Sequence, residues 1–465
     1  MQAALAIFHE AHAAQSPGWV SETLSPVPPP DNPGRLYEFV RASNEHQVEG
    51  DIRYAIKFSK VGRLSPKESN AWTDIFVSYW KAVGAILRAE EARNQHKLGD
   101  RQLLQIYDTW KEVVNNLIKY LQNGTLPHWV VMVLHRAANH LRLFAIDADE
   151  YLAKSKPVTF SSDLSDDVVS SAPRNEKLEE SARLFNRVFA LCLGDRNPDL
   201  SESRKWGVYA IANLQFKTYF KLKNVSLSKN VVRSIQAQSD LPDFKLYPAA
   251  HRVTYKYYVG VLEFLQENYP KAEEHLTEAW DACYPSSHKN QELILNYLIP
   301  CCLITKHKVP SKTLLSGSLN LQRIFGPLAA CIKSGDLVGF DAALQSNEPE
   351  LVKRRIFLTL ERSRDIAMRN LFRKVYLAAG YEDLKEGQAE KDRIRKSRIP
   401  LVHFATALRM GIAGEGSGQY IEDEEVECLL ANLIYKVGGF FLGSSTVTDL
   451  QSHLTFHYCC MFHGS

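Results

Sequence analysis

Residues 423–436 read Asp423-Glu424-Glu425-Val426-Glu427-Cys428-Leu429-Leu430-Ala431-Asn432-Leu433-Ile434-Tyr435-Lys436. The opening acids suit the positive end of a helix dipole, and the closing lysine suits the negative end. Apolar residues recur at helical spacing, at positions 426, 429, 430 and 433. This stretch therefore predicts a helix that packs one face inward and leaves the other face free for a partner or a nucleic acid groove.

Two further short helices are predicted upstream of this stretch. An apolar helix contains Leu371, Val375 and Tyr376, and Arg398-Ile399-Pro400-Leu401 opens the next one after a basic connector. Glycines at 411, 414, 416 and 418 follow a helix and have no neighbouring lysine, so they indicate a turn rather than a phosphate loop. Three short helices in tandem predict a helix-turn-helix core.

The composition is that of an ordinary soluble globular protein of two or three domains. The chain has 465 residues, 45% of them hydrophobic and 23% charged, and a net charge of +3. Mild basicity permits nucleic acid or acidic partners without requiring them. Eight cysteines occur singly or as adjacent pairs without a C-x-x-C framework, which indicates a reducing compartment. No apolar run approaches the length of a membrane span.

Helical periodicity dominates the chain from residue 36 onward. Segments 66–95, 101–122 and 126–153 repeat apolar residues every three or four positions. Between Tyr255 and Ala279, large and small residues alternate as in a tetratricopeptide-like helical pair, so the aromatic residues there are assigned to packing. Further helices are expected at 291–298 with a stop at Pro300, at 321–333 before a turn at 335–336, and at 350–371.

These patterns predict an all-α protein with five regions. Residues 1–35 form a short helix and a proline-rich linker from Ser16, and residues 36–199 form N-terminal helical repeats with a flexible loop near 154–175. Residues 200–379 form a second helical-repeat subdomain, and 380–443 form a subdomain around the helix-turn-helix core. Residues 444–465 are an atypical tail.

Four segments, in this order, carry a resemblance to a known family. They are Lys289 to Pro300, Asn370 to Tyr376, Arg398 to Leu401 and Glu424 to Lys436. Together they resemble a PCI domain, the module shared by the proteasome lid, the signalosome and a translation initiation factor. More narrowly, they are similar to the family of signalosome subunit 12-like proteins and PCI-domain-containing protein 2, over roughly residues 200 to 436.

The resemblance implies a non-catalytic scaffold subunit of a TREX-2-like complex that couples transcription to nuclear messenger RNA export. The implied partners are a larger scaffold of the germinal-centre-associated nuclear protein type and a small acidic subunit shared with the proteasome lid. The resemblance also implies that residues 380–443 form a winged-helix subdomain, which would contribute to RNA or DNA binding within the complex. The implied location is the nucleus, including nuclear pores, and also the cytoplasm. The alternatives are a signalosome- or proteasome-lid-associated PCI subunit and a stand-alone nucleic-acid-binding regulator.

The sequence departs from the family pattern after Lys436. Val437 to Gly443 begins as a wing would, but 454–463 contains neither lysine nor arginine, where the family has a basic end. This departure predicts an incomplete wing. His453, His457, Cys459, Cys460 and His463 supply metal-ligand side chains, yet their spacing fits no usual zinc site.

No catalytic motif occurs, and neither a cofactor nor a metal is expected. The chain lacks a phosphate-cradling G-x-x-x-x-G-K-[ST], an H-E-x-x-H and a G-x-S-x-G. The best site candidate is basic: the nucleic-acid-binding candidates are Lys391, Arg393, Arg395, Lys396, Arg398 and, at the end of the recognition-type helix, Lys436. A solvated surface loop is the competing interpretation of the basic run. Arg373 and Lys374 fit an exposed helix face equally well.

Overall fold

The computed structural model describes residues 2–58, 64–97, 99–155, 175–383, 396, 399–412 and 421–438. Throughout these ranges the regular secondary structure is helical, and no strand occurs in them. The prediction of an all-α protein is thereby confirmed for these ranges. No helix in the described ranges is long and apolar enough to cross a membrane.

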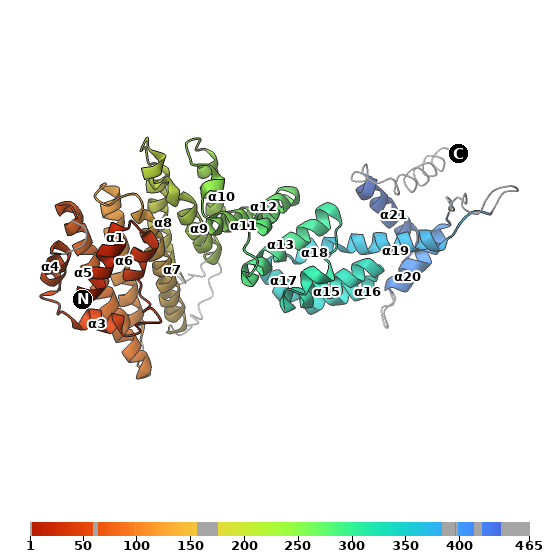
Figure 1. Ribbon diagram of the computed structural model, residues 1–465. Coiled ribbons are helices and arrows are strands. Elements are labelled where there is room, and N and C mark those ends of the chain that lie inside the picture. The colour runs from red at the N-terminus through yellow and green to blue at the C-terminus, as the bar shows by residue number, and fades with distance from the viewer. Residues whose placement is uncertain are drawn as a thin grey trace, which may run out of the picture. The chain divides into compact units, whose positions relative to one another are not determined.

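The chain divides into two compact units, Met1–Tyr258 and Val259–Ser465. The division lies inside one helix, α11 (Ala249–Leu265). The sequence placed subdomain boundaries after residues 199 and 379, at the start and end of the second helical-repeat stretch. The units are described one at a time below, with the helix labels of Figure 1.

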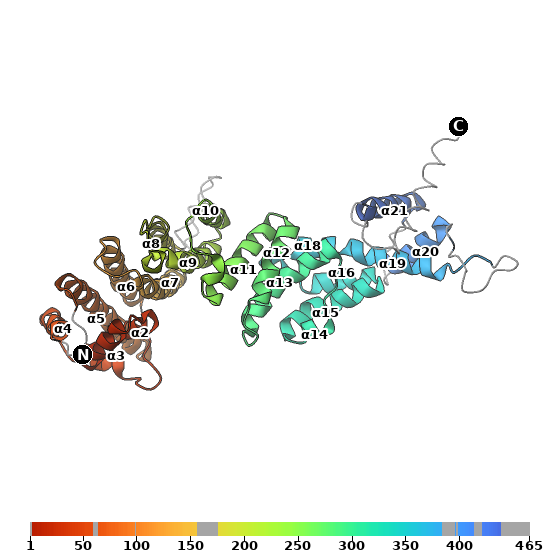
Figure 2. The same ribbon diagram turned by 45° about the horizontal axis from the view of Figure 1, so that its top comes forward.

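The first unit is built from helices that pack mainly on their neighbours in sequence. They are α1 (Gln2–Ala13), α2 (Pro17–Thr23), α3 (Arg35–Arg41), α4 (Val48–Lys57), α5 (Pro66–Asn94), α6 (Asp100–Gln122), α7 (Val130–Ser155), α8 (Glu176–Leu193), α9 (Val208–Lys221), α10 (Val225–Gln236) and the first part of α11. The predicted helices at 66–95, 101–122 and 126–153 correspond to α5, α6 and α7, which lie side by side in Figures 1 and 2. Trp110 is fully buried between α6 and α7, and its indole Nε1 donates to the Ala137 carbonyl at 2.8 Å.

The N-terminal region confirms one expectation and corrects another. The short helix predicted before Ala14 is α1, whose Phe8 packs against Trp72 of α5 with ring centroids 4.8 Å apart. The linker predicted from Ser16 contains a helix instead, because Pro17 occupies the first helical position, where its fixed φ is an advantage. The Ser16 hydroxyl caps that helix. The predicted loop near 154–175 lies almost wholly outside the described residues.

The second unit continues the series of helices. It contains the end of α11, α12 (Tyr269–Asp281), α13 (His288–Lys306), α14 (Lys312–Leu315), α15 (Leu319–Ser334), α16 (Leu337–Ser346), α17 (Glu348–Arg354), α18 (Phe357–Arg362), α19 (Arg364–Ala378), α20 (Leu401–Ile412) and α21 (Asp423–Gly438). The predicted helical pair near 255–279 is α11 and α12. A Cβ on Gly260 would lie 2.7 Å from Leu276 Cγ, so glycine permits the close approach of the two helices.

Helix α13 runs through Pro300, where the sequence predicted a stop. A proline inside a helix costs about 3 kcal/mol, since it removes one hydrogen bond and crowds the preceding turn. Leu298, Ile299 and Leu303 are all buried around it. Each such side chain contributes about 1.5–3 kcal/mol on burial, which outweighs the cost of the proline.

The single helix predicted over 350–371 is wrong: α17, α18 and α19 occupy this part of the chain. Arg355 ends α17 in the left-handed conformation, with φ at 59°. Its amide donates to the Val352 carbonyl at 2.9 Å, and Ile356 just beyond is fully buried. Burial of Ile356 offsets the cost of about 1–2 kcal/mol for a non-glycine residue in this conformation.

Candidate partner and nucleic-acid interface

Helices α19, α20 and α21 form a small module at the end of the second unit, at the blue end of the ribbon in Figures 1 and 2. The Phe372 ring of α19 meets the Phe404 ring of α20 edge to face, with centroids 5.5 Å apart. Leu408 of α20 and Val426 of α21 are fully buried. The predicted tandem of three short helices is therefore present. The wing was predicted to begin at Val437, but Val437 and Gly438 still belong to α21, and the rest of the predicted wing lies outside the described residues.

Arg409 holds the end of α20 to the start of α21. Its guanidinium donates from Nε and Nη2 to the Ile421 carbonyl, at 3.0 and 2.8 Å, and from Nη2 to Asp423 Oδ1 at 2.6 Å. Gly411, the first glycine of the predicted turn, lies inside α20, whereas Gly414, Gly416 and Gly418 lie outside the described residues. Because the side chain bridges 12 and 14 positions, no local pattern in the sequence indicated it.

The first turns of α21 carry negative charge at the surface. Asp423, Glu424, Glu425 and Glu427 are all exposed. Val426 is buried, while Leu429 and Leu430 are only partly covered, so the predicted inward face is narrower than expected. Carboxylates repel nucleic acid phosphates, so this end of the helix is unsuited to enter a groove.

Few of the predicted nucleic-acid-binding residues can be placed. Lys396 is exposed, and its amide donates to the Gly380 carbonyl at 3.1 Å, next to the end of α19. Lys436 lies in the last turns of α21. The other candidates, Lys391, Arg393, Arg395 and Arg398, lie outside the described residues, as do the His and Cys side chains of the tail.

Lys374 has a structural role that the sequence did not indicate. Its Nζ donates to the Ser334 carbonyl at 2.6 Å, and Asn370 Nδ2 donates to the Ile332 carbonyl at 2.7 Å. Both carbonyls belong to the last turn of α15, where a cation complements the negative end of the helix dipole. Arg373, its neighbour on α19, is exposed.

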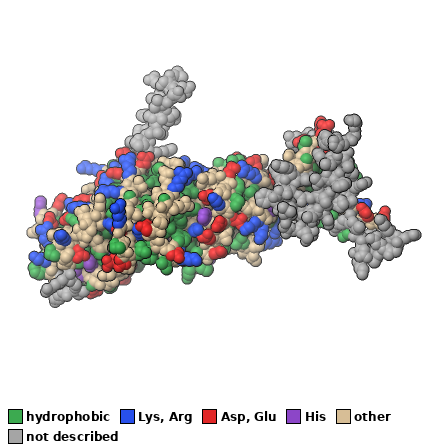
Figure 3. All heavy atoms as spheres, turned by 90° about the horizontal axis from the view of Figure 1, so that it is seen from above, with side chains coloured by type: hydrophobic (Ala, Val, Ile, Leu, Met, Phe, Trp, Pro, Cys, Tyr) green, Lys and Arg blue, Asp and Glu red, His purple; other side chains and the backbone are tan. Residues whose placement is uncertain are grey.

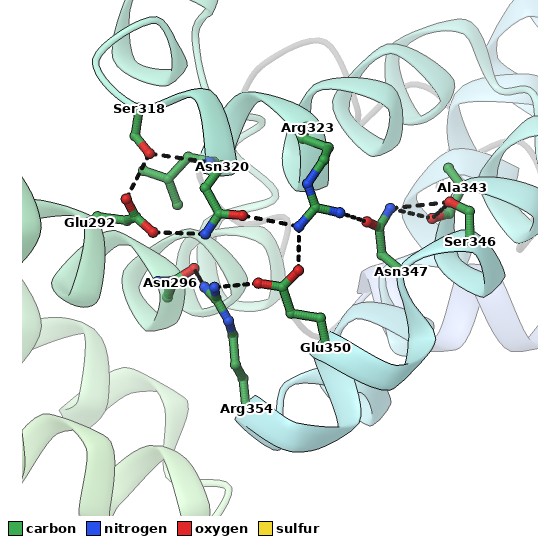
Figure 4. A network of polar contacts seen from close by, with 11 residues as sticks. Glu292, Asn296, Ser318, Asn320, Arg323, Ala343, Ser346, Asn347, Glu350 and Arg354 are labelled. Atoms are coloured by element: carbon green, nitrogen blue, oxygen red, sulfur yellow. Dashed lines mark hydrogen bonds and ion pairs between the residues drawn. The ribbon is translucent and has the colours of Figure 1, made fainter. Parts of the chain in front are cut away.

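A network of polar side chains joins α13, α15 and α17 in the second unit, as Figure 4 shows. Its members are Glu292 and Asn296 of α13, Ser318, Asn320 and Arg323 at the start of α15, and Asn347, Glu350 and Arg354 of α17 and its cap. Glu292 accepts from Ser318 Oγ at 2.8 Å and from Asn320 Nδ2 at 2.7 Å. The network therefore fixes three helices through directional bonds in addition to apolar packing.

Glu350 is the centre of this network. It accepts from Arg354 at 2.5 Å and also from Arg323, which in turn donates to Asn347 Oδ1 at 2.6 Å. The Arg323 hydrogen bond, with Arg354 close by, holds the pKa of Glu350 below its ordinary value. The i,i+4 spacing of Glu350 and Arg354 is visible in the sequence and is typical of an ion pair on one helix face. The other members are too far apart in the chain for any local pattern.

The described residues contain no group of three or more His, Cys, Asp or Glu side chains placed to hold a metal. Cys192, Cys283, Cys301, Cys302, Cys331 and Cys428 are free thiols. On the coloured part of the face shown in Figure 3, Lys and Arg side chains are interspersed with Asp and Glu. Any electrostatic recognition on that face must therefore be local.

Comparison with known proteins shows close relatives over most of the chain. It is 44% identical over 436 residues to a protein CSN12 homolog of Gibberella zeae, covering 92% of each chain. It is 34% identical over 368 residues to a protein CSN12 homolog of Schizosaccharomyces pombe, covering 79% of this chain and 78% of the relative. PCI domain-containing protein 2 of Xenopus laevis is 30% identical over 358 residues, with coverage of 77% and 78%. A search against models of protein families finds no match.

Helical repeats followed by a three-helix module, together with these relatives, define a PCI-domain protein. Within that class, the chain belongs to the family shared by the CSN12 homologues and PCI domain-containing protein 2. The resemblance drawn from four sequence segments is thereby confirmed.

Proposed function

We propose that the protein is a non-catalytic scaffold subunit of a TREX-2-like complex that couples transcription to nuclear messenger RNA export. It binds a larger scaffold of the germinal-centre-associated nuclear protein type and a small acidic subunit shared with the proteasome lid. It works in the nucleus, including nuclear pores, and also in the cytoplasm. The similarity to PCI domain-containing protein 2 over 77% of the chain carries this proposal.

An uncovered apolar face on α20 supports the docking of a protein partner. Val402 is 54% exposed and Met410 is 76% exposed, and Thr406 between them is also at the surface. These three residues are four apart, so they share one side of the helix. Large apolar side chains on one exposed helix face are typical of interaction sites. We assign this face to the scaffold partner.

The test is co-elution of the full chain with the PCI-binding region of the scaffold partner and the acidic subunit, at about 0.15 M salt. The unaltered chain is expected to form a stable ternary peak. Val402→Asp is expected to remove the chain from that peak, because a carboxylate buried without a partner costs several kcal/mol. Val352→Asp on α17 is the matched control, since Val352 is 53% exposed but lies outside the terminal module.

Two outcomes would count against this proposal. If the folded chain elutes alone and instead copurifies with ubiquitin-related complexes, the signalosome- or proteasome-lid-associated role replaces it. If Val402→Asp and Val352→Asp co-elute equally well, the partner does not use the face of α20.

The basic segment is proposed to add nucleic acid affinity to the complex. Reversing the charge of Arg393, Arg395, Lys396 and Arg398 together is expected to weaken RNA and DNA binding by at least about tenfold and to flatten its salt dependence, because each phosphate contact releases counterions. Fluorescence anisotropy over a salt series measures both quantities. Reversing the charge of four exposed Lys or Arg side chains in the first unit controls for overall charge. An unaltered affinity would remove the segment from the site, and strong binding by the isolated chain would favour a stand-alone regulator.

A further inference from the structure

Three helices of the first unit bring basic side chains together. His135, Arg136 and Arg142 come from α7, Lys217 comes from α9, and His251 comes from the first turn of α11. The rings of His135 and His251 meet edge to face with centroids 5.8 Å apart. Arg142 Nη2 donates to the Lys217 carbonyl oxygen at 3.0 Å. Lys217 and Arg136 both act electrostatically on His135, so the five residues, hereafter the cation cluster, lie close together on the repeat.

The positive charge of the cation cluster comes from Arg136, Arg142 and Lys217, because lowered pKa values leave the rings of His135 and His251 uncharged near neutral pH. Burial, together with His251, Lys217 and Arg136, lowers the pKa of His135 to about 3. Burial and Lys217 lower the pKa of His251, while partial desolvation of the ammonium group and the charge of Arg142 lower that of Lys217, although its side chain reaches the surface. Among the described residues, no carboxylate contributes to any of these shifts.

A phenol also acts on the cluster, and a carboxylate of α7 is already paired with another lysine. Burial lowers the pKa of Arg142, and the phenol of Tyr258 on α11 raises it in part. One turn beyond Lys217 on α9, Lys221 pairs with Glu150 at 2.8 Å. Positive charge without a counter-ion weakens a folded protein, because like charges repel more strongly where water is partly excluded. A cluster of this kind is consistent with a bound anion.

Donor atoms in the cluster point to hydrogen bonding as well as charge. Arg142 Nε and His251 Nδ1 are buried, and within the described residues neither has a hydrogen-bond partner. Buried polar atoms in proteins are nearly always paired, so each requires an explanation. His251 also lies in the first turn of α11, where the helix dipole favours negative charge. Lys217 and Arg136 are exposed, which leaves the cluster open to solvent.

We propose that the cation cluster binds a phosphate monoester dianion, presented as a phosphorylated side chain of a partner polypeptide. A dianion with three oxygens accepts from several donors at once and neutralises more of the charge than one carboxylate does. A phosphodiester carries a single charge, so an internal nucleic acid phosphate satisfies the cluster less well. The site is separate from the terminal module and does not depend on the function proposed for it.

The test is calorimetric titration of the full chain with a short phosphoserine peptide without other charged side chains, at low salt. The same peptide without phosphate, inorganic phosphate and an oligonucleotide lacking terminal phosphates are titrated in parallel. The phosphopeptide is expected to bind, inorganic phosphate more weakly, and the unphosphorylated peptide not at all. Lys217→Gln is expected to weaken phosphopeptide binding at least about tenfold, since one charge-assisted contact is lost.

Lys221→Gln is the matched control, because Lys221 lies one turn away on the same helix and is exposed, but is paired with Glu150. It is expected to bind the phosphopeptide as the unaltered chain does. If Lys217→Gln does not fold, Arg136→Gln replaces it, since Arg136 is exposed and its loss also removes one positive charge from the cluster.

A second readout is the titration of the histidine rings by NMR. Phosphopeptide binding is expected to raise the pKa of His135 and His251, and Lys217→Gln alone to raise both slightly. The proposal is overturned if the phosphopeptide does not bind, if Lys217→Gln and Lys221→Gln bind it equally, or if the oligonucleotide binds as tightly as the phosphopeptide.

Discussion

Gly335→Ala is expected to lower the free energy of unfolding of the second unit by about 3 kcal/mol or more. Gly335 ends α15 at a φ of +68°, a conformation that costs a residue with a Cβ about 1–2 kcal/mol. The added Cβ would also lie 2.7 Å from the backbone N of Leu371 and 2.8 Å from its Cα. Since backbone atoms of α19 cannot rotate away, α15 and α19 must separate. Chemical denaturation followed by circular dichroism measures the loss.

Gly380→Ala is the matched control for this prediction. Gly380 has a φ of +78°, but no atom lies within 4 Å of the position of its added Cβ. Its substitution therefore carries the conformational cost alone, about 1–2 kcal/mol. Equal losses for the two variants would show that the close approach of the added Cβ to Leu371 adds nothing to the cost of Gly335→Ala.

Glu350→Gln is expected to destabilise the second unit by about 1–3 kcal/mol near neutral pH, because two guanidinium groups lose their shared carboxylate. The lowered pKa of Glu350 also gives this loss a pH dependence. A carboxyl with a lowered pKa in the folded state contributes its stability in full above its unfolded pKa, and the contribution disappears as the pH falls through the folded pKa. Denaturation at about pH 6 and at about pH 3, on either side of the ordinary glutamate pKa, measures it.

The unaltered protein is therefore expected to lose more stability than Glu350→Gln between these two pH values. Glu348→Gln is the control, because Glu348 begins the same helix but is exposed. Its stability and pH dependence should follow the unaltered protein. If Glu350→Gln and Glu348→Gln have the same pH profile, the network of Figure 4 contributes no linked stability.

The long helices were predictable because their apolar spacing is carried by many residues in a row. The segment predicted at 66–95 is α5, Pro66–Asn94, and the segment at 101–122 is α6, Asp100–Gln122. Over such lengths the 3.6-residue period outweighs any single exception. The family resemblance rested on a similar accumulation, since four weak segments in the right order are more specific than any one of them.

Single residues misled the prediction where tertiary packing outweighed local preference. Pro300 indicated a stop, yet burial of the side chains around it keeps α13 helical to Lys306. Arg355 gave no sign of a break, because arginine favours helices and only the burial of Ile356 explains the left-handed turn. Neither outcome follows from a window of sequence.

The candidate interface was less predictable than the fold, because charge becomes a site only through its neighbours. The position of the acidic residues at the start of α21 was predicted. That they form an exposed acidic surface there became clear only from the structure. Lys374 is exposed, as predicted, but its bond to the end of α15 was not indicated by the sequence. The members of the cation cluster are spread between positions 135 and 251. In the sequence each one therefore looks like an isolated surface charge.

The packing of most helices on their neighbours in sequence also bears on how the chain folds during synthesis. As α6 leaves the ribosome, α5 is already present to receive it, and α7 then docks on α6 in its turn. Contacts that close short stretches of chain form early and fast. The first unit can thus be largely assembled before α13 is translated, which shortens the time that its apolar helix faces are open to aggregation.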